Sequence, residues 1–226
     1  MKRIFICLII IFLPQFNNTT GAVGKIFSFY NNDLYSSLKL ADTGLSRKAF
    51  DYALKGLKRL IGNNQIKNDH ILSIADYSQP SFKKRFYVID LKEKKLLYNT
   101  YVAHGRNSGE VYATTFSNQE GSLKSSLGFY ITGNTLNTAH TGYSLLLKGV
   151  ERGINDNALK RSIIMHGAEY VTENFIRKWG RTGRSFGCPA LPPDLYKPVI
   201  ETIKEGTCLF IYNPDPSYLS KSGLLN

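Results

Sequence analysis

The spacing of apolar residues predicts a helix in the N-terminal part of the chain. Between residues 43 and 61, apolar side chains recur every three or four positions and so fall on one helical face. Thr43 or Ser46 can cap its start, and Gly62 ends it. We expect this helix to cover one face of a domain rather than to serve as an arm against a partner. The preceding residues 23–43 have mixed polarity and predict a partly ordered leader.

From residue 71 onward, short apolar runs between polar turns predict mainly β structure. Residues 85–91 and 95–103 flank Lys92-Glu93-Lys94 like the two arms of a hairpin. The pattern alternates over residues 71–77, which predicts another strand. Further strands are expected at residues 127–132, 143–150, 161–165 and 207–212.

Polar segments between these runs predict loops, and one late segment predicts a helix. Residues 117–126 are expected to form a polar loop, and Asn155-Asp156-Asn157 a turn or helix cap. Residues 180–187 are rich in Gly, Arg and Ser and fit no periodic element. The last helix is expected to start at Pro192-Pro193-Asp194, to carry Leu195, Val199 and Ile203, and to close at Gly206.

The first 22 residues have the composition of a secretory signal peptide. Lys2 and Arg3 precede an unbroken apolar run over residues 4–13, and the small residues at 20–22 suit signal peptidase. This run is too short for a stable membrane span, although an uncleaved anchor is the alternative. We therefore expect an exported protein of the periplasm or cell envelope, with no stable membrane span after signal cleavage.

The charge of the chain bears on its partners. The formal net charge is +12, and cleavage after residue 22 would lower it to +10. The basic residues are scattered and lack the basic-aromatic ladder of a nucleic-acid module, so no nucleic acid partner is expected. Anionic envelope polymers are the simpler partners for an exported protein, and a merely solvated basic surface is the alternative.

The candidate chemistry lies in residues 161–191. Residues 161–165 predict a buried strand that delivers His166 at its C-terminal end. About twenty residues later, the loop Ser185-Phe-Gly-Cys-Pro presents Cys188 between small neighbours. A histidine can accept the proton of a thiol, and only the thiolate is a good nucleophile. On spacing alone, a half-buried cysteine and a hydrogen-bonded histidine at a strand end are an equal alternative.

Two further features concern the cysteines. Arg177, Arg181 and Arg184 would add positive potential that favours a thiolate at Cys188. Cys208 could pair with Cys188 in an oxidising compartment. A nucleophile must stay free, however, so we expect no disulfide.

Longer strings around these motifs carry a family resemblance. The chain resembles the catalytic domain of the murein L,D-transpeptidases, the penicillin-insensitive enzymes that cross-link the wall. The similarity runs from about Ile74 to Tyr212 and rests on five strings in a fixed order: VAHGRNSG, FSNQEGS, SSLGFYITG, GINDNALKRSIIMHGA and GRSFGCPALP.

The resemblance implies a fold and a set of roles. The fold would be mainly β with flanking helices, an L,D-transpeptidase-like β-sandwich with the active cleft at its edge. Residues 1–22 would be the signal peptide, 23–70 an N-terminal extension and 71–226 the catalytic domain. Cys188 would be the nucleophile and His166 the base that forms an ion pair with it, oriented by the carbonyl of Gly167.

The same resemblance assigns the residues around the nucleophile. Backbone N–H groups of Gly187 and Cys188 would form the oxyanion hole, while Ser185 and Arg184 would shape the loop and bind substrate. Pro189 departs from the Ile, Val or Ala often found after this cysteine, which makes acceptor specificity harder to carry over. No cofactor and no metal are implied.

The implied substrate is a peptidoglycan tetrapeptide stem. Attack on the bond between its third residue and the terminal D-alanine would release D-alanine and leave a thioester. An amine acceptor then gives transpeptidation, and water gives L,D-carboxypeptidation. A secreted cysteine peptidase is an alternative, but the expected order there is Cys before His. A non-catalytic wall-binding module is another, although it would have no need for this whole set of residues.

Polar residues upstream supply further candidates. His104 also precedes a glycine, and we name five possible substrate-side residues, for which a structural loop role is equally consistent: His104, Asn107, Ser108, Ser117 and Asn118. A zinc site built from His104, His140, His166 and Cys188 is a weak alternative. The chain has no Cys-x-x-Cys and no His-x-x-x-His pair on one element.

Overall fold

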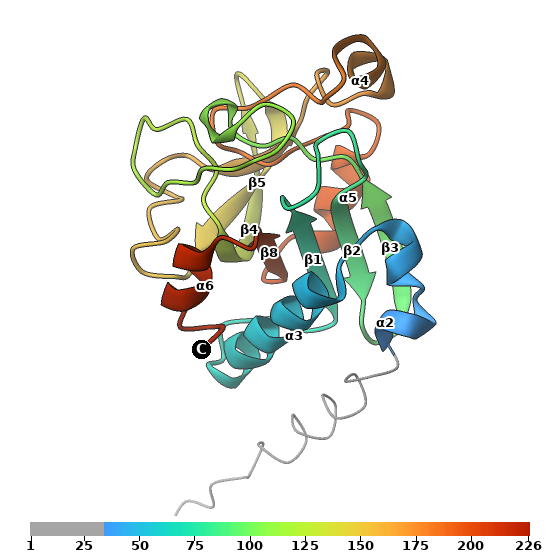
Figure 1. Ribbon diagram of the computed structural model, residues 1–226. Coiled ribbons are helices and arrows are strands. Elements are labelled where there is room, and N and C mark those ends of the chain that lie inside the picture. The colour runs from blue at the N-terminus through green and yellow to red at the C-terminus, as the bar shows by residue number, and fades with distance from the viewer. Residues whose placement is uncertain (1–33) are drawn as a thin grey trace, which may run out of the picture.

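The computed structural model describes residues 34–226, so the signal-peptide prediction lies outside the described residues. Its centre is one eight-stranded sheet in the order β3-β2-β1-β8-β4-β5-β6-β7 (Figure 1). The strands are β1 (Ile71–Asp76), β2 (Phe86–Asp90), β3 (Lys95–Thr100), β4 (Gly128–Thr138), β5 (Gly142–Gly149), β6 (Ile164–Gly167), β7 (Ala190–Leu191) and β8 (Cys208–Tyr212). The prediction of mainly β structure is confirmed.

The two ends of the sheet order approach each other. β3 and β7 are the edge strands, yet Ala103, three residues after β3, pairs with Ala190 of β7. The Ala103 N–H donates to the Ala190 carbonyl at 2.9 Å. The sandwich expected from the sequence is therefore one continuous sheet that nearly closes on itself.

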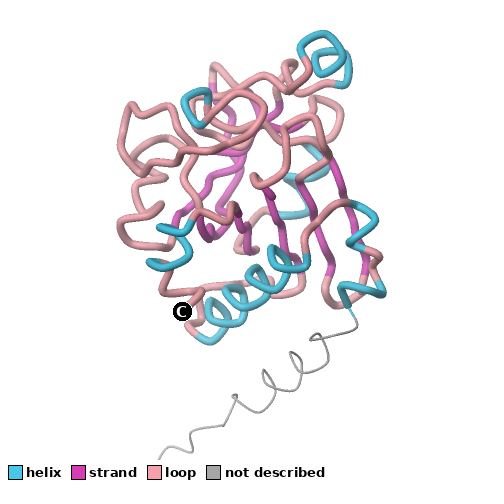
Figure 2. Tube along the Cα trace, viewed as in Figure 1, coloured by secondary structure: helices cyan, strands magenta, loops and turns pink. Residues whose placement is uncertain are grey.

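Helices cover the sheet, and loops occupy much of the remaining chain (Figure 2). The helical elements are α2 (Leu34–Ser37), η1 (Leu40–Thr43), α3 (Arg47–Gly62), η2 (Arg106–Ser108), α4 (Glu173–Trp179), α5 (Tyr196–Ile203) and α6 (Pro216–Lys221). In residues 34–226 no helix has both the length and the apolar character needed to cross a bilayer.

Helix α3 confirms the predicted amphipathic helix. Ser46 caps it, because the Ser46 hydroxyl accepts from the Ala49 N–H at 3.1 Å, and Gly62 is its last residue. Its buried face packs on β1 and β8 and belongs to the same hydrophobic core as the strands. The part of the expected leader that is described, residues 34–43, consists of α2 and η1 joined by a turn at residues 38–39, with Leu34 and Leu40 buried.

Strand β1 differs from the expected alternating pattern, because all six of its residues are buried. It lies between β2 and β8, and both α3 and α5 contact it. Since successive side chains point to opposite faces of a sheet, burial along the whole strand means that both faces are covered. The polar Asp76 at its end is satisfied locally, by the Ser78 N–H at 3.1 Å and by Gln79 Nε2 at 2.9 Å.

The hairpin, the polar loop and the turn at residues 155–157 are where the sequence placed them. Two expectations about element boundaries need correction. The last helix starts at Tyr196, after a turn that contains Pro192 and Pro193, and the histidine strand starts at Ile164 rather than at Arg161. The structure also adds three short elements that the sequence did not suggest: α4, β7 and α6.

Gly56 gives a stability prediction. A Cβ there would lie 2.0 Å from Cζ of Phe129, whose ring is fully buried and stacks on Phe210 at 4.2 Å. Gly56→Ala should therefore destabilise the protein by about 1–3 kcal/mol through overpacking, although alanine is the better helix former by about 1 kcal/mol. Urea unfolding of wild type and Gly56→Ala measures this change in the free energy of unfolding. Gly62→Ala is the control, since that position has no atom within 4 Å; equal stability of the two variants would contradict the explanation.

Candidate active site

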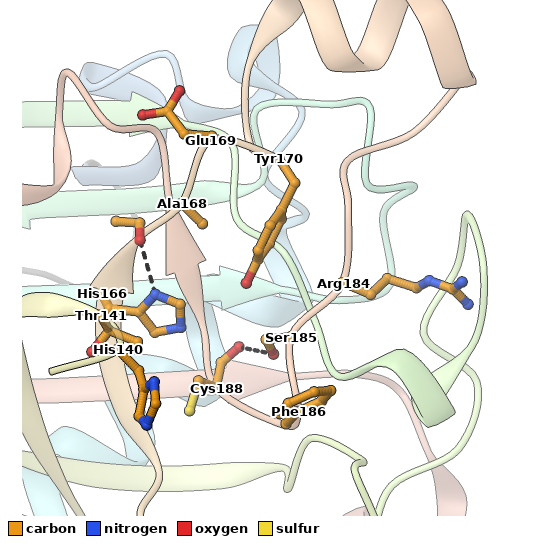
Figure 3. Close-up of a pocket in the computed structure, with 11 residues that line it drawn as sticks. His140, Thr141, His166, Ala168, Glu169, Tyr170, Arg184, Ser185, Phe186 and Cys188 are labelled. Atoms are coloured by element: carbon orange, nitrogen blue, oxygen red, sulfur yellow. Dashed lines mark hydrogen bonds between the residues drawn. The ribbon is translucent and has the colours of Figure 1, made fainter. Parts of the chain in front are cut away.

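His166 and Cys188 line the same pocket at the end of β6. His166 pairs in parallel register with Ala190 of β7, and Cys188 lies two residues before that partner. The pocket has a volume of about 680 Å³ (Figure 3). Its lining residues are His140, Thr141, His166, Gly167, Ala168, Glu169, Tyr170, Arg184, Ser185, Phe186 and Cys188.

The imidazole of His166 has a fixed orientation. Its Nδ1 lies 2.9 Å from the carbonyl oxygen of Gly167, drawn as a dashed line in Figure 3. A carbonyl oxygen only accepts, so Nδ1 carries the proton and Nε2 is left as the basic nitrogen. The expected orienting role of the Gly167 carbonyl thus has the required geometry. A glycine also fits here because a Cβ would lie 2.5 Å from the ring of Tyr196.

The electrostatics favour uncharged forms of both groups. Desolvation raises the pKa of the Cys188 thiol above its ordinary value, against smaller opposing effects of a backbone hydrogen bond from Ile164 and the charge of Arg161. Desolvation also lowers the pKa of His166, opposed by its hydrogen bond to the Gly167 carbonyl. Both shifts disfavour the thiolate–imidazolium pair expected from the sequence. Both directions favour a neutral thiol and a neutral imidazole.

The hydrogen bonding of the thiol agrees with this state. Cys188 Sγ lies 3.8 Å from the Ser162 carbonyl oxygen, which can only accept a proton. Within the described residues, no hydrogen bond joins Sγ to the His166 ring. The thiol and the imidazole thus have separate hydrogen-bond partners, the Ser162 carbonyl for Cys188 and the Gly167 carbonyl for His166.

Arg161 is the cation that acts on the thiol, in place of the three arginines that we expected. It lies in the turn before β6, and its Nη1 donates to the Ser117 carbonyl at 2.8 Å while Nη2 donates to the Lys124 carbonyl at 2.6 Å. Arg181 and Arg184 instead form ion pairs with Glu110. Arg161 thus ties the polar loop at residues 117–126 to the base of the site.

Ser185 holds the loop that carries Cys188. Its hydroxyl donates to the Cys188 carbonyl at 2.5 Å and accepts from the Gly187 N–H at 3.1 Å. The Gly187 N–H is thereby occupied inside the loop, which argues against its expected oxyanion role. Gly187 has a φ of +127°, and a Cβ there would lie 2.9 Å from the Lys124 carbonyl oxygen. This close backbone approach is the physical reason for a glycine before the cysteine.

The five possible substrate-side residues all have structural roles and lie outside the pocket. Asn107 Nδ2 donates to the Ser122 carbonyl at 3.0 Å, and the buried Ser108 hydroxyl accepts from the Ser125 N–H at 2.9 Å. Asn118 bonds Asp156 and Asn157 across the neighbouring turn. Ser117 accepts from Gln119 and Arg161. None of the five, which include His104, lines the space around Cys188.

His104 is fully buried and interacts with a buried arginine. Arg85 Nη2 lies 2.7 Å from His104 Nδ1, and His104 Nε2 lies 3.2 Å from the Gly109 carbonyl oxygen. Because arginine only donates, His104 is the neutral tautomer protonated on Nε2. Desolvation, followed by the charge of Arg85, lowers the pKa of His104 to about 3. No catalytic role follows from this position.

This buried histidine predicts a dependence of stability on pH. The pKa of His104 is about 3 when folded and 6.5 when unfolded, so only the unfolded chain takes up this proton between those values. Stability should therefore fall as the pH decreases from 6.5, by up to about 1.4 kcal/mol per pH unit from this residue. Urea unfolding of wild type and His104→Gln at pH 7, 6 and 5 measures the difference. Parallel stability curves would contradict it.

Thr141 and Tyr170 line the pocket but were not named from the sequence, and His140 was named only as a ligand of the alternative zinc site. His140 and Thr141 lie in the β4–β5 turn, and Tyr170 follows β6 by three residues. Figure 3 shows the Tyr170 side chain with its hydroxyl directed into the pocket. Its pKa is raised by desolvation and then by the nearby Cys188 charge. The sequence offers one weak signal for Tyr170, its short distance from His166; the turn residues carry none.

The zinc alternative is not supported by these positions. His104 lies outside the pocket, bonded to Arg85, while His140, His166 and Cys188 line it. Across residues 34–226, no three His, Cys, Asp or Glu side chains are grouped so that they could hold a metal ion. Cys188 and Cys208 are both free thiols, and Cys208 is buried in β8.

Comparisons with known proteins were made on both sequence and structure. The family model of the L,D-transpeptidase catalytic domain matches residues 41–212. A comparison with curated proteins gives no significant match. Among solved structures, the chain is similar to an L,D-transpeptidase from Mycobacterium smegmatis, with 12% identity and a TM-score of 0.40 over 64% of this chain and 59% of that one.

Two other solved structures are similar to a comparable extent. An L,D-transpeptidase from Mycobacterium tuberculosis H37Rv has 13% identity and a TM-score of 0.37, over 64% of this chain and 58% of that one. The helical cell shape determining protein Pgp2 from Campylobacter jejuni has 15% identity and a TM-score of 0.42, over 63% and 47%. The matched regions thus span about half to six tenths of these solved chains. Because the family model matches most of its length, the chain belongs to the L,D-transpeptidase catalytic domain family.

Proposed function

We propose that this protein is an exported, cysteine-dependent L,D-transpeptidase that acts on peptidoglycan stem peptides. Membership of the family supports the reaction class. The observation that carries the proposal is the shared pocket of Cys188 and His166, with the imidazole fixed by the Gly167 carbonyl so that its Nε2 is free. A cysteine and a histidine with only structural roles would not need a pocket of about 680 Å³ between them.

The first half-reaction forms a thioester. Cys188 Sγ attacks the carbonyl carbon of the third stem residue while its proton passes to His166 Nε2. The C–N bond to the terminal D-alanine then breaks, and the same proton goes to the leaving amine. The neutral thiol and neutral imidazole of the free enzyme suit this route, because one proton moves from sulfur to nitrogen and then to the product.

The second half-reaction releases the acyl group. An acceptor amine loses a proton to His166 and attacks the thioester, which forms a new amide and returns the proton to Cys188. Water in place of the amine gives L,D-carboxypeptidation by the same steps. The relative concentrations of the two acceptors and the fit of the amine then decide the product.

The oxyanion of the tetrahedral intermediate needs hydrogen-bond donors. The Gly187 N–H is already donated to Ser185 Oγ, so the Cys188 N–H and the Tyr170 hydroxyl are the donors that we assign. The Tyr170 hydroxyl makes no hydrogen bond to another described residue; the Tyr170 carbonyl accepts from the Gly183 N–H at 2.7 Å, and Gly183 lies against the ring. Donors of this kind are worth about 2.7–4 kcal/mol of transition-state stabilisation each.

Export and location belong to the same proposal. The composition of residues 1–22 supports a signal peptide, and the basic surface suits anionic envelope polymers in addition to the stem peptide. A mature N-terminus mapped by mass spectrometry of protein recovered from the envelope would test this. Recovery of the whole protein in the cytoplasm would contradict it.

Intact-mass analysis with purified muropeptides tests the activity. Incubation should give a protein adduct equal to the stem minus D-alanine, and free D-alanine in solution. Cross-linked product shows transfer to an amine, and a shortened stem alone shows hydrolysis. Binding of muropeptide with neither adduct nor product would instead indicate a wall-binding module.

A further inference from the structure

A second, smaller pocket adjoins the catalytic one and is rich in arginine. It has a volume of about 280 Å³, and we call it the arginine pocket, lined by Arg106, Tyr170, Phe175, Arg181, Gly183, Arg184 and Phe186. Three of these residues, Tyr170, Arg184 and Phe186, also line the pocket of Cys188. In Figure 3 the Arg184 side chain extends away from Cys188 while Tyr170 points toward it. The two spaces therefore share one wall.

The arginine pocket carries an excess of positive charge. Glu110 is the carboxylate that pairs there, through Oε1 with Arg184 Nη1 at 2.5 Å and through Oε2 with Arg181 Nε at 3.1 Å. Among the described residues, no carboxylate lies within ion-pair distance of Arg106, whose guanidinium lies over the Phe186 ring at 5.9 Å. Three guanidinium groups thus face one carboxylate, which leaves a local charge of about +2.

The positions of these arginines are fixed by the catalytic loop. The Arg106 N–H donates to the Ser185 carbonyl at 2.7 Å, and the Ser185 N–H donates to the His104 carbonyl at 3.0 Å. Arg184 Nη1 also lies 3.3 Å from the Arg106 carbonyl oxygen. The backbone of Arg106 is therefore tied to the loop that carries Cys188, and the Arg181 and Arg184 guanidinium groups are held by Glu110. Such pre-organisation lowers the entropy lost when a ligand binds.

The chemistry of the arginine pocket indicates the ligand. Glu110 shows that Arg181 and Arg184 are spaced to hold the two oxygens of one carboxylate, and planar guanidinium groups suit that geometry. We propose that the arginine pocket binds a carboxylate of the peptide substrate, outside the bond that Cys188 attacks. Arg106 makes the new ion pair, and Phe175 and Phe186 flank the peptide. This inference rests on the proposed function, because it specifies the substrate of that same site.

The test uses pairs of synthetic tetrapeptides. Within a pair, one internal carboxylate is free in the first peptide and converted to a carboxamide in the second. One pair is made for each internal carboxylate of the stem. For one of these pairs, the wild-type kcat/KM should be about ten- to a hundredfold higher for the free acid than for the carboxamide. This range is that of a charge-assisted hydrogen bond. Arg106→Gln should lose this preference. The Arg106 side chain donates no hydrogen bond within the described structure, so the fold should be unaffected.

Arg152→Gln is the matched control. Arg152 is exposed and lines none of the described pockets, so its removal lowers the net charge equally without touching the site. It should keep the wild-type preference. A preference lost equally in both variants would show a general charge effect and overturn the inference. An unchanged preference in Arg106→Gln would also overturn the inference. The same holds if wild type turns over the two members of every peptide pair equally.

A binding measurement separates this inference from the proposed function. Calorimetric titration of the Cys188→Ala protein with each peptide pair requires no turnover. We expect tighter binding of the free acid by about tenfold or more, a preference that added salt weakens and that Cys188→Ala/Arg106→Gln lacks. If wild type has no activity but this preference is present, the transpeptidase proposal fails and the carboxylate site stands. If Cys188→Ala binds both members of every pair equally, or neither, the carboxylate site fails.

Discussion

Replacing Cys188 with alanine is expected to abolish acyl-enzyme formation and to lower turnover by at least about 10⁴-fold, because covalent catalysis has no second route once the nucleophile is gone. The substitution should leave the fold intact. Cys188 is partly exposed, and the one hydrogen bond of its thiol within the described residues is long, 3.8 Å to the Ser162 carbonyl oxygen. The loop itself is held by Ser185, whose two hydrogen bonds go to backbone atoms that alanine retains. Intact-mass spectrometry after incubation with a tetrapeptide donor measures the adduct.

Cys208→Ala is the matched control for this experiment. Cys208 is fully buried in β8, and desolvation raises the pKa of its thiol well above the ordinary range, so it cannot compete as a nucleophile near pH 7. The variant should acylate like wild type and lose stability on the order of 1 kcal/mol, as expected for one small buried group. An adduct that persists in Cys188→Ala, or that disappears in Cys208→Ala, would mean that the reactive thiol is not Cys188.

The parts of the fold that the sequence predicted are those set by local periodicity. The stripe of α3, its Ser46 cap and the β2–β3 hairpin each depend on residues close together in the chain. The strand that carries His166 and the Gly-rich loop before Cys188 follow the same rule. Local patterns of this kind are reliable because the residues that define them also form the element.

The parts that the sequence could not predict depend on contacts across the chain. Nothing local shows that Arg161 reaches back to Ser117 and Lys124, about forty positions earlier, or that Ser125 Oγ bonds the Gly187 carbonyl at 3.2 Å. His104 shows that the sequence can also suggest a site residue where the structure has a buried structural one. It follows a strand and precedes glycine, as a site residue would, but Arg85 pairs with it in the interior. The two histidines differ in their surroundings rather than in their sequence motif: His104 is buried against Arg85, whereas His166 lines the pocket of Cys188.

The protonation state is the part of the mechanism that the structure changes most. A thiolate–imidazolium pair was expected by analogy with other cysteine enzymes. Here desolvation raises the pKa of Cys188 and lowers that of His166, and both shifts favour the neutral pair. The sign of each shift then predicts how the rate depends on pH. Catalysis needs neutral His166, so kcat/KM should rise with pH through a pKa below 6.5 and stay level near pH 7.

Alkylation of Cys188 by iodoacetamide should follow a different curve. It needs the thiolate, so its rate should keep rising with pH through and above the ordinary thiol range. An ion pair would instead give a plateau of fast alkylation that begins at acidic pH. Measuring both profiles on the same wild-type preparation therefore distinguishes the two states. A plateau of alkylation below pH 6 would contradict the neutral pair.

His166→Ala tests the role of the base directly. We expect turnover to fall by a factor of about 10² to 10⁴, the usual range for a positioned acid–base group, because the substitution removes the imidazole that the Gly167 carbonyl orients. Alkylation at high pH should change only a few-fold, since it requires no leaving-group protonation and no hydrogen bond joins Sγ to the ring within the described structure. His70→Ala, at an exposed histidine beside Asp69, is the control and should match wild type in both assays. Turnover that survives in His166→Ala would assign the base elsewhere. A loss of alkylation as large as the loss of turnover would show instead that His166 already activates the thiol in the free enzyme.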